Sequence, residues 1–344
     1  MKKRLLALSL TLCLVFSAAG CGTWSKEAQE PEAQMKIVCT IFPEYDWVRQ
    51  ILGERAEETE LTLLMKNGAD LHSYQPTVWD LKKIAEADLF IYVGGESDFW
   101  VEAALDNTKK PDRIALNLME LLGDAVREEE HLEGMQTPGE EEHTHREADG
   151  HEEEEYDEHV WLSLRNAQLV CGGIEEALCT LDEENRRIYE KNAAAYQEML
   201  AALDEEYRKT VSQTPHPVLL FGDRFPFLYL ARDYGITCYA AFSGCSAETE
   251  ASFSTITNLA KKAEERCLPV ILAIDGSDQK IARTIAGNTR TRDQKVRVLN
   301  SMQSVSESEM EDGADYLGIM EENLRVLREA LAAGKGVQDG TACM

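Results

Sequence analysis

Short apolar runs rich in β-branched residues alternate with segments whose apolar residues recur at helical spacing, and this alternation limits the fold more than any other feature. Lys36–Phe42 is the first such run, apolar residues at helical spacing follow as far as Leu52, and Leu61–Met65 is the next run. The order strand, helix, strand favours a βαβ unit with parallel strands. We therefore predict an α/β fold whose parallel sheets are covered by helices.

The same alternation returns in both halves of the chain. Thr77 and Asp80 form a capping-box pattern that begins a second helix, and Leu89–Val93 is the following strand. Residues 166–209 contain no proline and keep helical spacing, which predicts one or two long helices between two βαβ lobes. Later strands are predicted at 218–221, 270–274 and 296–299, and later helices through Leu230, from about Gln279 and over 317–331.

The N-terminal segment has the pattern of an export signal that ends at a lipid-modified cysteine. Three basic residues precede the apolar run Leu5–Ala19, which is too short to span a bilayer as a helix. Small residues precede Cys21, as in a bacterial lipobox; an ordinary signal peptide with a chance cysteine is the alternative. We expect a body held by lipid on the extracytoplasmic face of the cell membrane. The predicted parts are a signal peptide (1–21), a tether (22–34), a first lobe (35–165), linking helices (166–210), a second lobe (211–333) and a tail (334–344).

The segment 128–158 interrupts the first lobe and has the most unusual composition of the chain. It contains fifteen acidic residues and one basic residue, Arg146, together with His131, His143, His145 and His151. A block of like charge with few large apolar residues cannot bury a core, so we predict a disordered loop. Its histidines are either incidental or a weak accessory site for cations, with His143, His145 and His151 as the candidate ligands.

Charge and cysteine spacing exclude several classes of function. The formal net charge is −28, so the surface repels phosphate polyanions and a nucleic-acid partner is not expected. The cysteines of the body include no CxxC pair, which argues against a thiolate zinc finger or a thioredoxin-like centre. The histidines outside the acidic loop are therefore the main candidates for chemistry.

Two of these histidines stand where a binding site would form. His72 lies between a predicted strand and a predicted helix, and His159 lies where the acidic loop gives way to apolar sequence. Their flanking segments and two others resemble the metal-specific solute-binding proteins of ABC importers, which deliver zinc or manganese. The segments are GADLHSYQPT (68–77), DEHVWLSLRNA (157–167), IFPEYDWVRQILG (41–53) and DYLGIMEENL (315–324).

This resemblance implies two α/β lobes joined by a long rigid helix, with one metal ion in the cleft between them. His72 and His159 match the first two histidine ligands of the family. The family's third ligand, a histidine, falls on Arg224, which cannot ligate a cation, and the fourth, an aspartate in many members, falls on Asn300. Asp223 is the nearest hard ligand to the third position, and its alternative role is to cap the following helix. Asn300 offers a carbonyl oxygen or a turn hydrogen bond.

Two imidazoles with one or two oxygen ligands suit zinc, whereas manganese prefers more oxygen ligands. We therefore expect a monomeric lipoprotein that captures zinc, with manganese as the alternative, and delivers it to an ABC transporter permease. An enzyme is not expected, because the sequence lacks a compact catalytic zinc motif such as HExxH. The remaining alternative is a surface lipoprotein that uses this fold for adhesion or partner binding, with a degenerate metal site.

Overall fold

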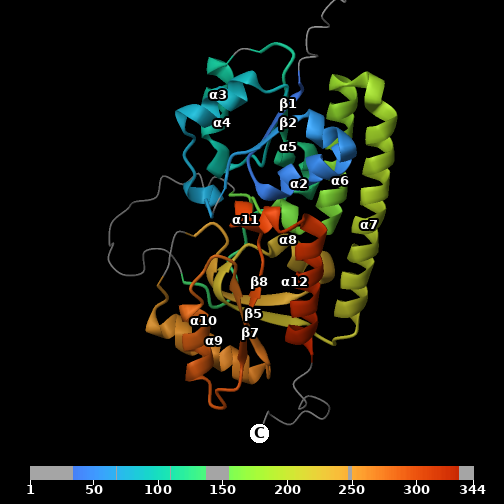
Figure 1. The fold of residues 1–344 in the computed structure, drawn as a ribbon. Coiled ribbons are helices and arrows are strands. Elements are labelled where there is room, and N and C mark those ends of the chain that lie inside the picture. Colours follow the sequence, from blue (N-terminus) through green and yellow to red (C-terminus); the bar gives the residue numbers. More distant parts are fainter. Residues whose placement is uncertain (1–33, 67, 109, 137–154, 247–249, 333–344) are drawn as a thin grey trace, which may run out of the picture. The chain divides into compact units, whose positions relative to one another are not determined.

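Two four-stranded parallel sheets form the framework of the part of the chain that the structure describes (Figure 1). The computed structural model describes residues 34–66, 68–108, 110–136, 155–246 and 250–332. The strand orders are β2-β1-β3-β4 in the first sheet and β6-β5-β7-β8 in the second, and all strand pairs are parallel. The predicted α/β class with two parallel sheets is confirmed.

The first lobe is built from short strands and crossover helices. Its capping box at Thr77 and Asp80 begins α3 as predicted, and Pro43 lies in the first turn of α2, where a missing N–H is tolerated. Strand β4 was not predicted. The elements are β1 (Lys36–Cys39), α2 (Phe42–Leu52), β2 (Glu60–Leu63), α3 (Val78–Glu86), β3 (Leu89–Tyr92), α4 (Trp100–Asn107), β4 (Ile114–Asn117) and α5 (Leu118–Leu122).

The second lobe repeats the strand order of the first. Strand β6 and helix α9 were not predicted. The alanines within β6 give a weak periodic signal, whereas α9 is amphipathic and was overlooked. The elements are β5 (Val218–Phe225), α8 (Leu228–Tyr234), β6 (Thr237–Ser243), α9 (Phe253–Glu265), β7 (Val270–Ile274), α10 (Lys280–Asn288), β8 (Lys295–Leu299), α11 (Glu307–Glu311) and α12 (Tyr316–Leu331).

Two long antiparallel helices connect the lobes, α6 (Leu164–Leu181) and α7 (Arg186–Ser212). Helix α6 packs against α2 and α5 of the first lobe, and α7 contacts α2 as well as α8 and α12 of the second lobe (Figure 1). The implied long connecting helix is therefore α7. No described helix is long and apolar enough to cross a bilayer.

Alternating residues of each strand bury different faces of its sheet. In β1, Ile37 and Cys39 join the large central core, whereas Val38 packs with the core under α3 and α4. In β5, Phe221 joins the central core and Leu220 packs under α9 and α10. The central core includes apolar residues of both lobes and of α6 and α7, so the lobes share one continuous hydrophobic interior.

The ends of the acidic segment 128–158 have defined partners, so the prediction of disorder is wrong for them. Glu128 and Tyr156 form an antiparallel bridge, and the Glu129 N–H donates to the carbonyl of Glu155 at 2.8 Å. Glu133 forms an ion pair of 2.7 Å with Lys262 of α9. Backbone pairing and basic partners in the second lobe offset the repulsion that the composition suggested. His131 is exposed on this segment.

Candidate metal centre

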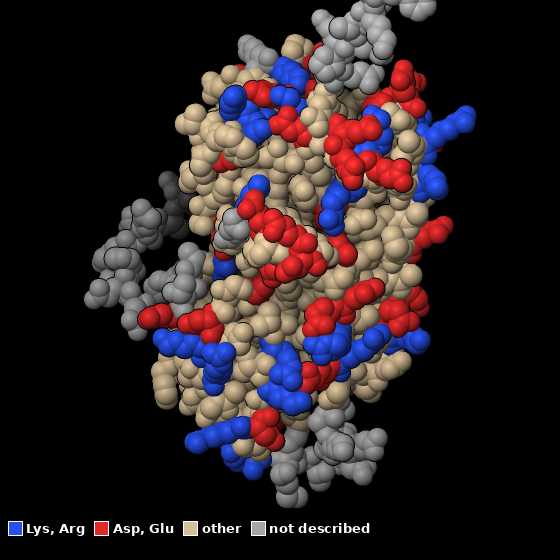
Figure 2. Space-filling model, viewed as in Figure 1, with Lys and Arg blue, Asp and Glu red and all other residues tan. Residues whose placement is uncertain are grey.

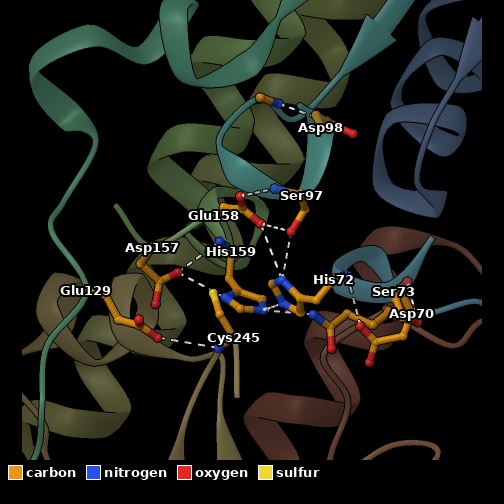
Figure 3. A network of polar contacts seen from close by, with 12 residues as sticks. Asp70, His72, Ser73, Ser97, Asp98, Glu129, Asp157, Glu158, His159 and Cys245 are labelled. Atoms are coloured by element: carbon orange, nitrogen blue, oxygen red, sulfur yellow. Dashed lines mark hydrogen bonds and ion pairs between the residues drawn. The ribbon is translucent and has the colours of Figure 1, made fainter. Parts of the chain in front are cut away.

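His72 is held by the turn that follows β2. It occupies a short 3-10 helix, Leu71–Ser73, which Asp70 caps by accepting the His72 backbone N–H at 3.0 Å. The His72 Nδ1 lies 2.9 Å from the Ser97 hydroxyl, which in turn donates to Glu158 (Figure 3). Because this hydroxyl–carboxylate pair fixes the proton on Nδ1, the His72 Nε2 keeps a free lone pair.

His159 is oriented by the carboxylate two residues before it. One oxygen of Asp157 accepts the His159 backbone N–H at 2.8 Å and faces the His159 Nδ1 at 3.0 Å. His159 is fully buried and Asp157 is 2% exposed, so solvent hardly screens this contact. The arrangement again places the proton on Nδ1 and leaves the lone pair of Nε2 free to bind a cation.

The two Nε2 atoms converge. They lie 3.2 Å apart, and the amide nitrogen of Gln303 lies 2.7 Å from the His159 Nε2. The thiol of Cys245 completes a group with both histidines in which all ligand atoms lie within 4.8 Å of one another (Figure 3). Cys245 and Gln303 belong to the second lobe, in the segments after β6 and β8. Side chains from both lobes therefore meet at one point.

The backbone at Gly244 and Gly95 makes this convergence possible. A Cβ atom at Gly244 would lie 3.0 Å from Cε1 of His159 and 2.9 Å from the Phe225 carbonyl oxygen. Gly95 has φ +79°, and a Cβ there would lie 2.4 Å from the Glu158 carboxylate. Both positions need the close approach that only glycine allows.

Neighbouring groups shift the pKa values of two side chains beside His72 and His159, namely Glu158 and Cys245. Burial of Glu158 opposes its negative charge, but hydrogen bonds from His72 and Ser97 outweigh burial and lower the pKa of its carboxyl. Burial raises the pKa of the Cys245 thiol, and the nearby charges of Glu129 and Asp157 raise it further. Cys238 and Cys245 are both free thiols and do not pair with each other.

Asp223 lies inside β5, so its alternative role as a helix cap is wrong; α8 begins later, after Phe227. The pairing of β5 with β6 shifts register between Phe221 and Arg224. The Asp223 carboxylate accepts the backbone N–H groups of Arg224 at 2.9 Å and Ile274 at 3.4 Å. It does not belong to the group of described residues around His72 and His159, and its role as a ligand stays a prediction.

Arg224 and Asn300, the departures from the family pattern, have their own partners. The Arg224 guanidinium pairs with Asp70 of the first lobe at 2.8 Å. Asn300 Oδ1 accepts the Met302 backbone N–H at 2.7 Å, which is a turn hydrogen bond. Ligation by Asn300 also stays a prediction. Cys21, His143, His145 and His151 lie outside the described residues.

A cavity of about 540 Å³ opens beside His72, lined from the first lobe by Asp70 and from the second by Asp223, Arg224 and Asp275. On the face shown in Figure 2, acidic side chains gather in the middle, where Figure 1 places α11. Helix α11 and its C-cap supply exposed Glu307, Glu309, Glu311 and Asp312. These carboxylates make this part of the surface negative.

Sequence reasoning found both histidines but missed Ser97, Cys245 and Gln303. Ser97 follows β3, Cys245 follows β6 and Gln303 follows β8, so all three stand beyond the carboxyl ends of strands, where ligand crevices form. Because β6 was not predicted, nothing in the sequence placed Cys245 at such an end. Asp157 and Glu158 could have been found, since they directly precede His159.

Two α/β lobes with convergent imidazoles between them define a metal-specific solute-binding protein. Residues 37–330 match the family model described as zinc-uptake complex component A, periplasmic, and the chain belongs to this family. The predicted family is thereby confirmed.

Known relatives agree with this assignment. The chain is 30% identical over 331 residues to the zinc-binding lipoprotein AdcA of Streptococcus pneumoniae, covering 95% of this chain and 61% of AdcA. It thus spans about three fifths of the length of that relative. It is 29% identical to the high-affinity zinc uptake system protein ZnuA of Bacillus subtilis, covering 92% of this chain and 94% of ZnuA. The crystal structure of the Zn(II)-bound ZnuA-like domain of S. pneumoniae AdcA superposes with a TM-score of 0.67 at 28% identity, covering 87% of this chain and all of that domain.

Proposed function

We propose that this chain is the extracytoplasmic substrate-binding component of an ABC importer and that its cargo is zinc. The observation that carries the proposal is the 3.2 Å separation of the two Nε2 atoms of His72 and His159. Two nitrogen ligands of a tetrahedral zinc ion, with Zn–N bonds of about 2.0–2.1 Å, lie roughly 3.3 Å apart. The pair therefore needs almost no rearrangement to hold the ion.

The proton positions support the same assignment. Both Nδ1 atoms face carboxylates, Asp157 directly and Glu158 through Ser97, and this partner arrangement is typical of metal-bound histidines. Imidazole nitrogens favour zinc over manganese, which prefers carboxylate, carbonyl and water oxygens. The relatives named above as zinc-binding proteins favour zinc as well. Manganese is the alternative cargo.

Elemental analysis of the purified, dialysed body tests the proposal. We expect one tightly bound zinc per chain, and titration calorimetry should show weaker binding of manganese. His72→Ala should abolish the tight site. His216→Asn is the matched control, because His216 is an exposed histidine whose φ of 54° asparagine tolerates. A wild-type body without a stoichiometric metal site would refute the proposal.

On this proposal the metal is cargo and not a catalyst, and the partner is an ABC permease. The chain is a monomer that is anchored through Cys21. Cys21→Ala should release the protein from membranes or leave an uncleaved precursor, as fractionation and immunoblotting would show. Wild-type protein found wholly free in the medium would contradict anchoring. Zinc-dependent hydrolysis of model esters or peptides by the purified body would contradict the assignment as a binding protein.

Adhesion is the second candidate function. The chain resembles the laminin-binding adhesin Lmb of Streptococcus agalactiae, whose mutant structure superposes with a TM-score of 0.67 at 25% identity, covering 86% of this chain and 99% of that one. Arg224 and Asp70 also join the lobes across the cavity by an ion pair that involves no metal. If adhesion is the function, immobilised laminin should retain the metal-free protein. If zinc capture is the function, laminin should not retain it.

A further inference from the structure

We propose that Cys245 is the ligand that the second lobe contributes: as the cation binds, the thiol loses its proton to solvent, and the cation is then held by two imidazoles and one thiolate. This inference rests on the proposed function, metal capture by His72 and His159, and specifies the chemistry of that site. A binding protein must also distinguish its loaded from its empty state. A cargo can shift the equilibrium between the empty and the loaded state only if its contacts differ between the two states. The second lobe must therefore touch the cargo.

The distances suit a thiolate ligand. The Cys245 sulfur and both Nε2 atoms lie within 4.8 Å of one another. Around a tetrahedral zinc ion with a Zn–S bond of about 2.3 Å, sulfur and nitrogen ligands lie roughly 3.6 Å apart. The sulfur therefore needs to move by little more than an ångström to reach the cation, while the imidazoles are already in place.

The segment that carries Cys245 is fitted to His159. Gly244 brings the backbone against the imidazole, where a Cβ atom would lie 3.0 Å from His159 Cε1 and would force a shift. The Cys245 N–H is directed at Glu129 Oε1 at 3.4 Å, which ties this second-lobe segment to the acidic segment of the first lobe. Cys245 is a free thiol, and no disulfide withdraws it from the site.

The other second-lobe candidates are engaged elsewhere. Asp223 accepts two backbone N–H groups, Asn300 accepts one, and Arg224 is a cation paired with Asp70. Gln303 remains beside the His159 Nε2 at 2.7 Å. Rotation of its amide would present an oxygen to the fourth position of the cation, so the full set is two nitrogens, one sulfur and one oxygen.

A thiolate also determines the class of cation. Thiolate and imidazole together suit zinc and softer ions, whereas manganese gains little from sulfur. Zinc selectivity of this chain thus depends on Cys245 rather than on the histidine that the family places at Arg224.

Cobalt(II) titration of the purified body tests the inference directly. Wild-type protein should show a near-ultraviolet sulfur-to-cobalt charge-transfer band together with the visible bands of a tetrahedral ion. Cys245→Ser should lose the charge-transfer band, and its zinc affinity should fall by more than the roughly 10 to 100-fold typical of outer partners of metal ligands. Its preference for zinc over manganese should narrow.

Cys238→Ser is the matched control, because Cys238 is a second free cysteine of the same lobe. It should keep the band and the affinity, and Asp223→Ala should lose less affinity than Cys245→Ser. Wild-type protein that binds cobalt and zinc without a charge-transfer band would overturn the ligation by Cys245 while leaving the proposed function intact. Wild-type protein that binds neither ion would overturn the proposed function itself.

Discussion

Replacement of Asp157 by asparagine isolates the electrostatic part of His159 positioning. Asparagine has nearly the same shape and can still accept both hydrogen bonds, but it removes the charge that fixes the proton on Nδ1. A net hydrogen bond contributes about 1 kcal/mol when both groups are neutral and about 1.5–3 kcal/mol when one is charged. Because Asp157 is 2% exposed, little of the difference is lost to solvent.

Asp157→Asn should therefore weaken zinc binding by roughly 1.4 kcal/mol, which is about tenfold. Asp157→Ala, which leaves the His159 N–H groups without their acceptor, should cost up to about 100-fold. Competition with a zinc-binding chromophore measures both values, and nitrogen-15 chemical shifts of the imidazole report the tautomer. Asp124→Asn changes an exposed aspartate of the same lobe and is the control. If folded Asp157→Asn matches Asp124→Asn in affinity, the positioning argument is wrong.

Three further perturbations test separate parts of the argument. Gly244→Ala should weaken zinc binding several-fold, because its Cβ would push the Cys245 segment away from His159; the same competition assay with unchanged affinity would contradict the close approach. Deletion of residues 137–154 should keep the tight zinc equivalent and remove only weaker ones, and calorimetry showing loss of the tight site would refute the accessory role of His143, His145 and His151. Burial and the charge of Asp98 raise the pKa of Glu44 to about 8. The folded state thus favours the protonated acid, so the free energy of unfolding of the wild type should fall as the pH rises from about 4 to 8, by roughly 1.4 kcal/mol per pH unit from this group. Glu44→Gln should remove most of that decline in urea unfolding at pH 5 and pH 8, and parallel declines would show that Glu44 is ionised in the folded protein.

The local part of the fold was predictable because it depends on periodicity and capping. Strand β7 matches its predicted limits, 270–274, and the pattern over residues 166–209 became the helices α6 and α7. Strand β6 was missed because its burial comes from the sheet and from α9 above it, and not from a strong apolar run of its own. The order at the two ends of the acidic segment was not predicted because its basic partners, Arg232 and Lys262, are distant in sequence.

The α/β class, the family and the two candidate histidines could be predicted from the sequence alone, because apolar periodicity and short motifs of neighbouring residues indicate them. Which side chains of the second lobe lie beside the two imidazoles depends on tertiary structure. Cys245 and Gln303 are 86 and 144 residues from His159 along the chain, and no local pattern marks them as its neighbours. Strand order and the glycine at position 244 bring them to the imidazoles, whereas Asp223, which adjoins the family's ligand position, is held by backbone N–H groups within its own lobe. Ligand sets formed across two lobes depend on such long-range packing, and residue type and spacing alone do not encode it.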